Sequence, residues 1–326
     1  MAVQKLLSLL VFQLVLVAFV LDITNAQGLK VGFYSNTCPN AEKIVKKTVT
    51  SFISRSPSLA GPLLRMFFHD CFVRGCDGSV LLNSTSSNQA EKDAFPNLSL
   101  RGYPVIDAVK AALEQQCRGV VSCADIIALV ARDAVSLTNG PFWQVPTGRR
   151  DGRVSKITDA LNNLPPPSSS ISTLKSTFAA KGLTVKDLVV LSGAHTIGVS
   201  HCTSFANRLY NFTGKNDSDP SMDPNYVAQL KTKCKPNDAT TIVEMDPGSS
   251  EKFDVDYYTL VSKRRGLFQS DAALLSDSTT KAYVQLQLTS KSTFAKDFGA
   301  SMVNMGKISV LTGKSGEIRK KCYLVN

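Results

Sequence analysis

Histidine is scarce in this chain, with only three among 326 residues. Two of them lie in the most distinctive motifs, Arg65-Met-Phe-Phe-His69-Asp-Cys-Phe-Val and Leu-Ser-Gly-Ala-His195-Thr-Ile-Gly. Because there are so few histidines, the role of each can be considered separately. By its neighbours, His69 suits acid–base chemistry, and His195 suits axial ligation of a metal.

A second long hydrophobic run is also missing. The first, Leu6–Leu21, follows Lys5 and precedes the small residues Thr24-Asn-Ala26. This order predicts a secretory signal peptide over residues 1–26 rather than a transmembrane anchor. We therefore expect a secreted protein that does not associate with membranes.

Internal repeats, long linkers and a Gly-x-Ser-x-Gly motif are absent as well. The last absence argues against a serine hydrolase. Residues 27–326 should form one unit, either one domain or two tightly packed halves. Apolar residues recur at the helical period over residues 41–53, and capping-box patterns begin at Ser122 and Thr184. We expect a mainly α protein with very little β structure.

Basic residues outnumber acidic ones, and the formal net charge is +11. A basic secreted protein is drawn to polyanions, and we expect an anionic cell-wall polysaccharide rather than nucleic acid. The alternative interpretation is that the charge mainly serves solubility.

The eight cysteines all follow the predicted leader, and an even number in a secreted chain predicts four disulfides. A zinc site is the alternative, because Cys71-x4-Cys76 and His201-Cys202 have suitable spacings. No second pair of soft ligands supports it, and His201 is left without a role. Four N-glycosylation sequons also fit a secreted glycoprotein. They begin at Asn83, Asn97, Asn211 and Asn216.

Arg65 and His69 are four residues apart, so a helix would place them on one face. In apolar surroundings a neutral imidazole can take a proton from a weak acid, while a guanidinium stabilises developing negative charge. A surface arginine beside a hydrogen-bonded core histidine is the alternative.

Hard oxygen ligands follow His69, at Asp70, Asp77 and Ser79. Gly75 and Gly78 allow the backbone between them to turn its carbonyls inward. This pattern predicts a Ca²⁺ site that is not an EF-hand.

His195 follows Gly193 at the end of an apolar segment, where a large flat ligand could approach the backbone. A ligating histidine usually donates its other ring N–H to a carboxylate or carbonyl, and Asp271 is a candidate acceptor. A hydrogen-bonded core histidine is the alternative.

Taken together, the two histidine motifs resemble the class III haem peroxidases, the secretory plant peroxidases. The likeness spans the whole mature chain. It includes all eight cysteines, Phe33-Tyr-Ser-Asn-Thr-Cys-Pro-Asn40, Glu91-Lys-Asp-Ala-Phe-Pro-Asn97, Val121-Ser-Cys-Ala-Asp125 and Gly148-Arg-Arg-Asp151. The resemblance implies a haem peroxidase domain over residues 27–326, with two helical halves enclosing one haem b.

The resemblance also implies roles for single residues. His195 would be the axial ligand of the haem iron, with Asp271 bonded to its other nitrogen. Pro165 would line the site for small aromatic donors.

On the opposite face of the haem, the resemblance makes His69 the distal base. Arg65 would assist cleavage of the O–O bond, and Asn97, backed by Glu91, would hold the other nitrogen of His69. Because Asn97 must then be buried, we predict that its sequon carries no glycan.

Two calcium ions and four disulfide pairings are implied in the same way. The distal calcium ligands would be Asp70, Val73, Gly75, Asp77 and Ser79. The proximal ligands would be Thr196, Asp246, Ser249, Asp254 and, through its carbonyl, Lys252. The pairings would be Cys38–Cys117, Cys71–Cys76, Cys123–Cys322 and Cys202–Cys234.

The implied protein is a monomeric enzyme that reduces H₂O₂ to water while oxidising phenolic donors of lignin, suberin or the wall in one-electron steps. It would take part in the response to oxidative stress. Only Tyr323-Leu-Val-Asn326 follows Cys322, which leaves no room for a vacuolar tail and favours the extracellular space or cell wall. A non-catalytic protein that binds wall polymer on the same scaffold is the alternative.

Overall fold

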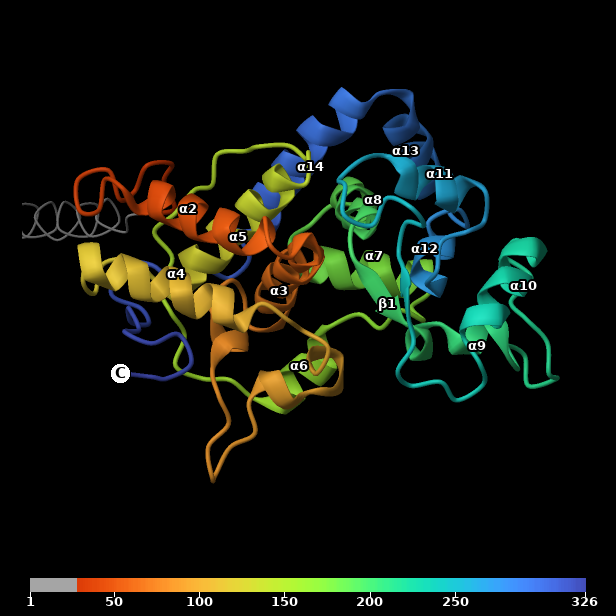
Figure 1. Ribbon diagram of the computed structural model, residues 1–326, viewed down its shortest axis with the longest axis horizontal. Helices are drawn as coiled ribbons and strands as arrows, with labels where there is room; N and C mark the ends of the chain where they lie inside the picture. Colours follow the sequence, from red (N-terminus) through yellow and green to blue (C-terminus); the bar gives the residue numbers. More distant parts are fainter. Residues whose placement is uncertain (1–27) are drawn as a thin grey trace, which may run out of the picture.

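Helices dominate the computed structural model, which describes residues 28–326 (Figure 1). The predicted signal peptide lies outside the described residues. The α-helices are α2 (Ala41–Ile53), α3 (Ala60–Val73), α4 (Tyr103–Gln116), α5 (Cys123–Leu137), α6 (Ile157–Asn163), α7 (Ile171–Ala180), α8 (Val185–Ser192), α9 (Ala206–Leu209), α10 (Pro224–Lys233), α11 (Asp256–Ser262), α12 (Gln269–Ala273), α13 (Ser278–Thr289) and α14 (Lys291–Met305).

The helix starts that were predicted from capping patterns are confirmed. The Ser122 hydroxyl accepts a hydrogen bond from the Asp125 N–H at 3.1 Å, which starts α5. A reciprocal capping box joins Thr184 and Asp187 at the start of α8. In both places a side-chain oxygen satisfies a backbone N–H that has no partner within the helix. The helix predicted over residues 41–53 is α2.

Strands are few, as expected. β1 (Val199–His201) pairs antiparallel with β2 (Ile242–Glu244), and Val199 lies opposite Glu244. The expectation of a mainly α fold with very little β is therefore confirmed.

Every residue of α5 from Cys123 to Val135 is buried, so this helix lies inside the core. α2 and α3 pack against it, and α8 packs against α13 and α14. Figure 1 shows α2 to α5 on one side and α7, α8 and α11 to α13 on the other. One hydrophobic core runs through both groups, and a smaller one surrounds Phe205 and Tyr226. None of the helices in residues 28–326 is long and apolar enough to cross a bilayer.

All eight cysteines form disulfides, so the zinc alternative is wrong. Paired sulfurs have no thiolate to offer a metal. The bonds are those that the resemblance implied: Cys38–Cys117, Cys71–Cys76, Cys123–Cys322 and Cys202–Cys234.

Candidate active site

α3 carries Arg65 and His69 on one face, as their spacing predicted. The Arg65 Nε donates to His69 Nε2 at 3.0 Å. The same guanidinium donates to the Ser99 hydroxyl at 2.9 Å and to the Pro96 carbonyl at 2.6 Å. Sequence reasoning missed Ser99 and Pro96, and the one signal for them was their position beside Asn97. Arg65 is thus fixed by the loop opposite α3.

The second nitrogen of His69 is held by Asn97. The Nδ1 of His69 lies 2.5 Å from the Asn97 Oδ1, and the Asn97 Nδ2 donates to the Glu91 carbonyl at 2.7 Å. Since an amide oxygen only accepts, this network assigns the proton to Nδ1 and leaves the lone pair on Nε2. Glu91 supports Asn97 through its backbone rather than its carboxylate. Asn97 is 1% exposed, which agrees with the prediction that its sequon carries no glycan.

Burial sets the protonation states of this pair. Burial and the positive charge of Arg65 lower the pKa of His69 to about 3, although the hydrogen bond that His69 donates to Asn97 acts in the opposite direction. Burial also lowers the pKa of Arg65, to about 10. At neutral pH the site therefore combines a neutral imidazole with a charged guanidinium. That combination suits proton abstraction from a weak acid.

His195 lies in a short 3₁₀ segment, η5 (Gly193–Thr196), that continues α8. Its Nδ1 lies 2.8 Å from the Asp271 Oδ1, although the two residues are 76 positions apart. Asp271 is 1% exposed and also accepts from the Tyr257 hydroxyl at 2.9 Å and the Phe268 N–H at 2.8 Å. This carboxylate fixes the tautomer that leaves Nε2 of His195 free, which is the arrangement of a metal-ligating histidine.

Gly193 packs closely against the core on the side where a Cβ would point. A Cβ at this position would lie 2.5 Å from the Tyr258 hydroxyl and 2.7 Å from the Phe294 ring. Close packing against these two core side chains therefore accounts for the glycine.

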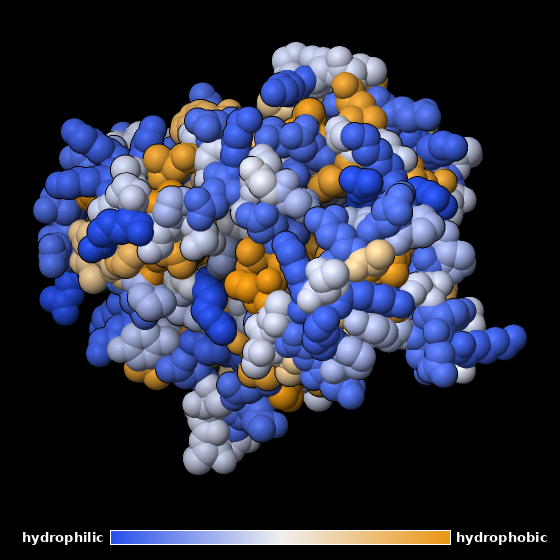
Figure 2. Space-filling model, turned by 45° about the vertical axis from the view of Figure 1, so that its right-hand side comes forward, coloured by the Kyte–Doolittle hydropathy of each residue, from blue (hydrophilic) through white to orange (hydrophobic). Residues whose placement is uncertain are grey.

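Three features of the two histidine segments bear on whether they could hold an iron-bearing cofactor. α3 and the chain after η5 meet at Gly61 and Gly198, where a Cβ on Gly61 would lie 2.9 Å from the Gly198 Cα. The side chain of His195 keeps 36% of its surface exposed, and its Nε2 has no hydrogen bond within residues 28–326. Arg65 and Phe68 are partly exposed as well. A free imidazole nitrogen is what haem iron requires of its protein ligand. Figure 2 shows that apolar atoms are exposed on one face of the molecule, with hydrophilic atoms around them.

Buried acidic groups gather directly after His69. Asp70 is fully buried, and neither one of its oxygens nor the buried Ser79 hydroxyl has a partner among residues 28–326. Burial, and then the charge of Asp77, raise the pKa of Asp70, and burial raises the pKa of Asp77. Both oxygens of the Glu91 carboxylate lack partners too. Buried carboxylates that lie close together, and buried oxygens without hydrogen-bond donors, are costly unless a cation balances them. The all-oxygen donor set fits Ca²⁺.

The two carbonyl ligands that the resemblance implied for this calcium accept internal hydrogen bonds. The Val73 carbonyl accepts from the Lys181 Nζ at 3.4 Å, and the Gly75 carbonyl accepts from the Asp77 N–H at 2.8 Å. Each carbonyl has a second lone pair, so neither contact prevents ligation. No three His, Cys, Asp or Glu side chains cluster among residues 28–326, so this site depends on hydroxyl and carbonyl oxygens.

A second oxygen cluster follows His195. The Thr196 hydroxyl lies 3.3 Å from Asp246 and 3.2 Å from Asp254, and the Ser249 hydroxyl donates to Asp254 at 2.9 Å. Burial and the charges of Asp254 and Asp256 raise the pKa of Asp246 to about 7. The Lys252 ammonium lies 3.5 Å from Asp254 and partly balances these charges. This oxygen-rich, acidic cluster also fits Ca²⁺.

Two other residues singled out from the sequence lie apart from these clusters. Pro165 is half-buried in the loop after α6, and this loop is tied to α12 by the bond from the Ser270 N–H to the Pro167 carbonyl at 2.9 Å. The loop is thus linked to the element that carries Asp271. His201 lies in β1, and its buried Nδ1 has no partner within the described residues.

Comparison with known proteins agrees with this geometry. The model of the peroxidase family matches residues 45–290. The chain is 63% identical to Peroxidase 27 of Arabidopsis thaliana over 303 residues, which cover 93% of this chain and 94% of the relative. It is 62% identical to Peroxidase 56 of the same plant over 304 residues, or 93% and 92% of the two chains. It is 55% identical to Peroxidase 1 of Oryza sativa subsp. japonica over 325 residues, or 98% and 99%.

Proposed function

The chain belongs to the class III plant peroxidases, which bind haem and calcium, and we propose that it reduces H₂O₂ while oxidising a donor. The substrates are H₂O₂ and small phenolic donors, which are oxidised one electron at a time. The observation that carries the proposal is the pairing of Arg65, His69 and Asn97 with a second histidine, His195, anchored on a carboxylate.

Haem b, when bound, would supply the redox chemistry of the reaction, taking electrons from the donor and delivering them to peroxide. His195 would hold the iron. Asp271 accepts the Nδ1–H of His195, which leaves Nε2 free for that bond and would make the imidazole a stronger electron donor. The Tyr257 hydroxyl and the Phe268 N–H hold Asp271 in place.

His69 moves the proton. Its Nε2 accepts the proton of the incoming peroxide and returns it to the departing oxygen, which leaves as water. Asn97 keeps the Nδ1–H engaged throughout, so Nε2 remains the acceptor. With a pKa of about 3, His69 is neutral and ready to act over the whole physiological range.

Arg65 stabilises the negative charge that develops as the O–O bond breaks. Its Nε occupies the lone pair of His69 that must receive the proton. The guanidinium therefore has to release this lone pair before each proton transfer. Its bonds to Ser99 and the Pro96 carbonyl keep it beside the site meanwhile.

The two proposed calcium ions each hold one histidine in place. The distal site begins at Asp70, the neighbour of His69, and the proximal site begins at Thr196, the neighbour of His195. The proposed distal ligands are Asp70, Val73, Gly75, Asp77 and Ser79, and the proximal ligands are Thr196, Asp246, Ser249, Lys252 and Asp254.

The setting of the reaction is proposed from the same family. Residues 27–326 are the catalytic domain, and residues 1–26 are a signal peptide. Four disulfides support passage through an oxidising compartment, and we place the monomeric glycoprotein in the extracellular space or cell wall. Phenolics of lignin, suberin or the wall bind beside Pro165. The net charge of +11 favours retention on anionic wall polysaccharide, and the activity would serve the response to oxidative stress.

The test is a donor panel assayed on the purified, haem-loaded protein. We expect a haem absorption band and peroxide-dependent oxidation of phenols, both lost together in His195→Ala. His69→Leu should keep the haem band yet slow peroxide cleavage by about 10²- to 10⁴-fold, since it removes the base. A colourless protein that binds anionic polysaccharide without oxidising phenols would refute the proposal.

A further inference from the structure

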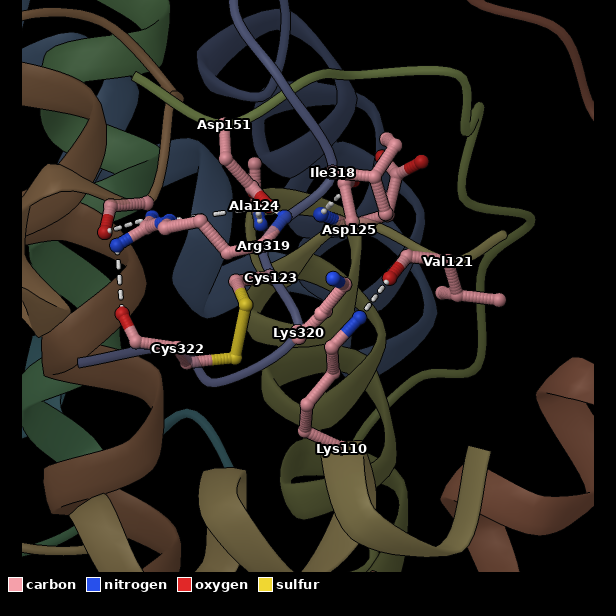
Figure 3. The surroundings of a disulfide bond; sticks show 12 residues. Lys110, Val121, Cys123, Ala124, Asp125, Asp151, Ile318, Arg319, Lys320 and Cys322 are labelled. Carbon is pink, nitrogen blue, oxygen red and sulfur yellow. Dashed lines mark hydrogen bonds and ion pairs between the residues drawn. A yellow bond between two sulfur atoms is a disulfide. The ribbon is translucent and has the colours of Figure 1, made fainter. Parts of the chain in front are cut away.

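The C-terminal segment returns to the loop that carries the proposed distal calcium ligands. After α14 it pairs with the chain around Asp151, whose N–H donates to the Glu317 carbonyl at 2.8 Å. Cys322 then forms the disulfide with Cys123 at the start of α5. Figure 3 shows Arg319 between this disulfide and Asp151.

Arg319 is fully buried, and its guanidinium donates hydrogen bonds to backbone carbonyls rather than forming a close ion pair. Its Nη2 donates to the Gly78 carbonyl at 2.6 Å and lies 3.4 Å from the Asp77 carbonyl. Its Nη1 donates to the Cys322 carbonyl at 2.5 Å. The Asp151 carboxylate is 3.8 Å from the Nε, so the guanidinium connects the disulfide segment to the loop at residues 77–78.

The loop is shaped to receive this side chain. Gly78 has a φ of +70°, and a Cβ there would lie 2.6 Å from the Arg319 Nη2. On its other side, the Gly78 N–H donates to the Asp70 carboxylate at 3.0 Å. Gly78 therefore lies between Arg319 and a carboxylate of the proposed cage, and only glycine permits both contacts.

We propose that Arg319 is a positioning residue for the distal calcium site. By holding the Asp77 and Gly78 carbonyls, it presents the Asp77 carboxylate and the Ser79 hydroxyl to the cation. The Cys123–Cys322 disulfide and Asp151 in turn hold Arg319. The calcium affinity of the distal site is thus set by a segment more than two hundred residues away in sequence. This inference rests on the proposed calcium site.

Two effects of Arg319 on calcium oppose each other. Its positive charge repels a nearby cation, which would weaken binding. Its hydrogen bonds preorganise the loop, which would strengthen binding. The sign of the affinity change on removing the side chain therefore decides between them, and the proposal requires a loss of affinity.

The experiment is calcium titration calorimetry on the haem-loaded, disulfide-intact protein after mild chelation. Ser79→Ala identifies the distal event as the one it weakens. Arg319→Met removes both donors and charge, whereas Arg319→Lys keeps the charge but loses the fork that spans two carbonyls. The matched control is Arg208→Lys, because Arg208 is equally buried and donates to the carbonyls of residues 266–268 in another loop.

We expect Arg319→Met to weaken the distal event by about tenfold or more, since it orphans buried carbonyls. Arg319→Lys should lie between Arg319→Met and wild type, and the other event should not change. The Arg208→Lys control should keep the wild-type distal affinity. If Arg319→Met does not fold, Arg319→Lys carries the same test.

Unchanged or tighter distal binding in the Arg319 variants would overturn the positioning role while leaving the calcium site intact. A wild-type protein with no event that Ser79→Ala weakens would overturn the distal site, and this inference with it.

Discussion

Asn97→Val offers the sharpest test of how the distal base is prepared. The substitution removes the acceptor that holds the His69 Nδ1–H at 2.5 Å, whereas the Glu91 carbonyl loses the Asn97 amide but still accepts from the Ala94 N–H at 3.0 Å. His69 is 4% exposed, so little water can replace the lost acceptor. We therefore expect His69 to lose its single tautomer and its orientation.

The magnitude follows from the cost of an unsatisfied buried donor, about 1–3 kcal/mol. Because each 1.36 kcal/mol changes a rate by tenfold, the reaction with peroxide should slow by about 5- to 150-fold if the whole cost appears in the barrier. This is a smaller loss than for His69→Leu, since the base itself remains.

Stopped-flow absorbance in the haem band measures the peroxide step separately from donor oxidation. We expect Asn97→Val to slow only the peroxide step, while haem content stays at the wild-type level. Asn83→Gln is the matched control, because it removes a sequon at an exposed position away from His69. A wild-type peroxide rate in Asn97→Val would refute the role of Asn97.

Three further predictions concern pH, metal and modification. Because the folded pKa of His69 is about 3, its imidazole is neutral above that pH. It loses its ability to accept a proton only as pH falls through that value. The peroxide rate should therefore stay level from pH 8 to about pH 5, and an acid limb near the ordinary histidine pKa of about 6.5 would contradict the assignment. Chelating calcium should lower the thermal midpoint and the activity, because the carboxylates after His69 and His195 then repel one another. Calcium but not magnesium should restore both, and indifference to chelation would rule out the two sites. Peptide mapping should find Asn97 without a glycan, and a glycan there would remove this buried amide from the mechanism.

Local patterns predicted the local structure well. The N-cap bond at Ser122 and the capping box at Thr184 start helices where expected, because the bonds that cap a helix lie within a few residues of each other. The contact between Arg65 and His69 followed from a spacing of four on one helix. Cysteine number and compartment predicted that the thiols would be paired, but the pairings came only from the family resemblance.

Local patterns could not predict contacts between distant segments. Arg65 donates to Ser99, and Arg319 donates to the Gly78 carbonyl. No periodicity in the sequence relates the residues of either pair. A glycine such as Gly193 shows only that a side chain would not fit there. It does not show what fills the space, which here is Tyr258 and Phe294.

The sequence by itself determined the helical class, the paired cysteines and, through two long histidine motifs, the family and its chemistry. These properties depend on neighbours in the chain or on motifs long enough to identify a family. Only the tertiary structure decided which carboxylate oxygen faces His195, how Asn97 assigns the proton on His69, and which arginine supports the loop at Gly78. The reason is physical: burial and hydrogen-bond geometry arise when segments far apart in the chain pack together, and those packings set pKa values and tautomers.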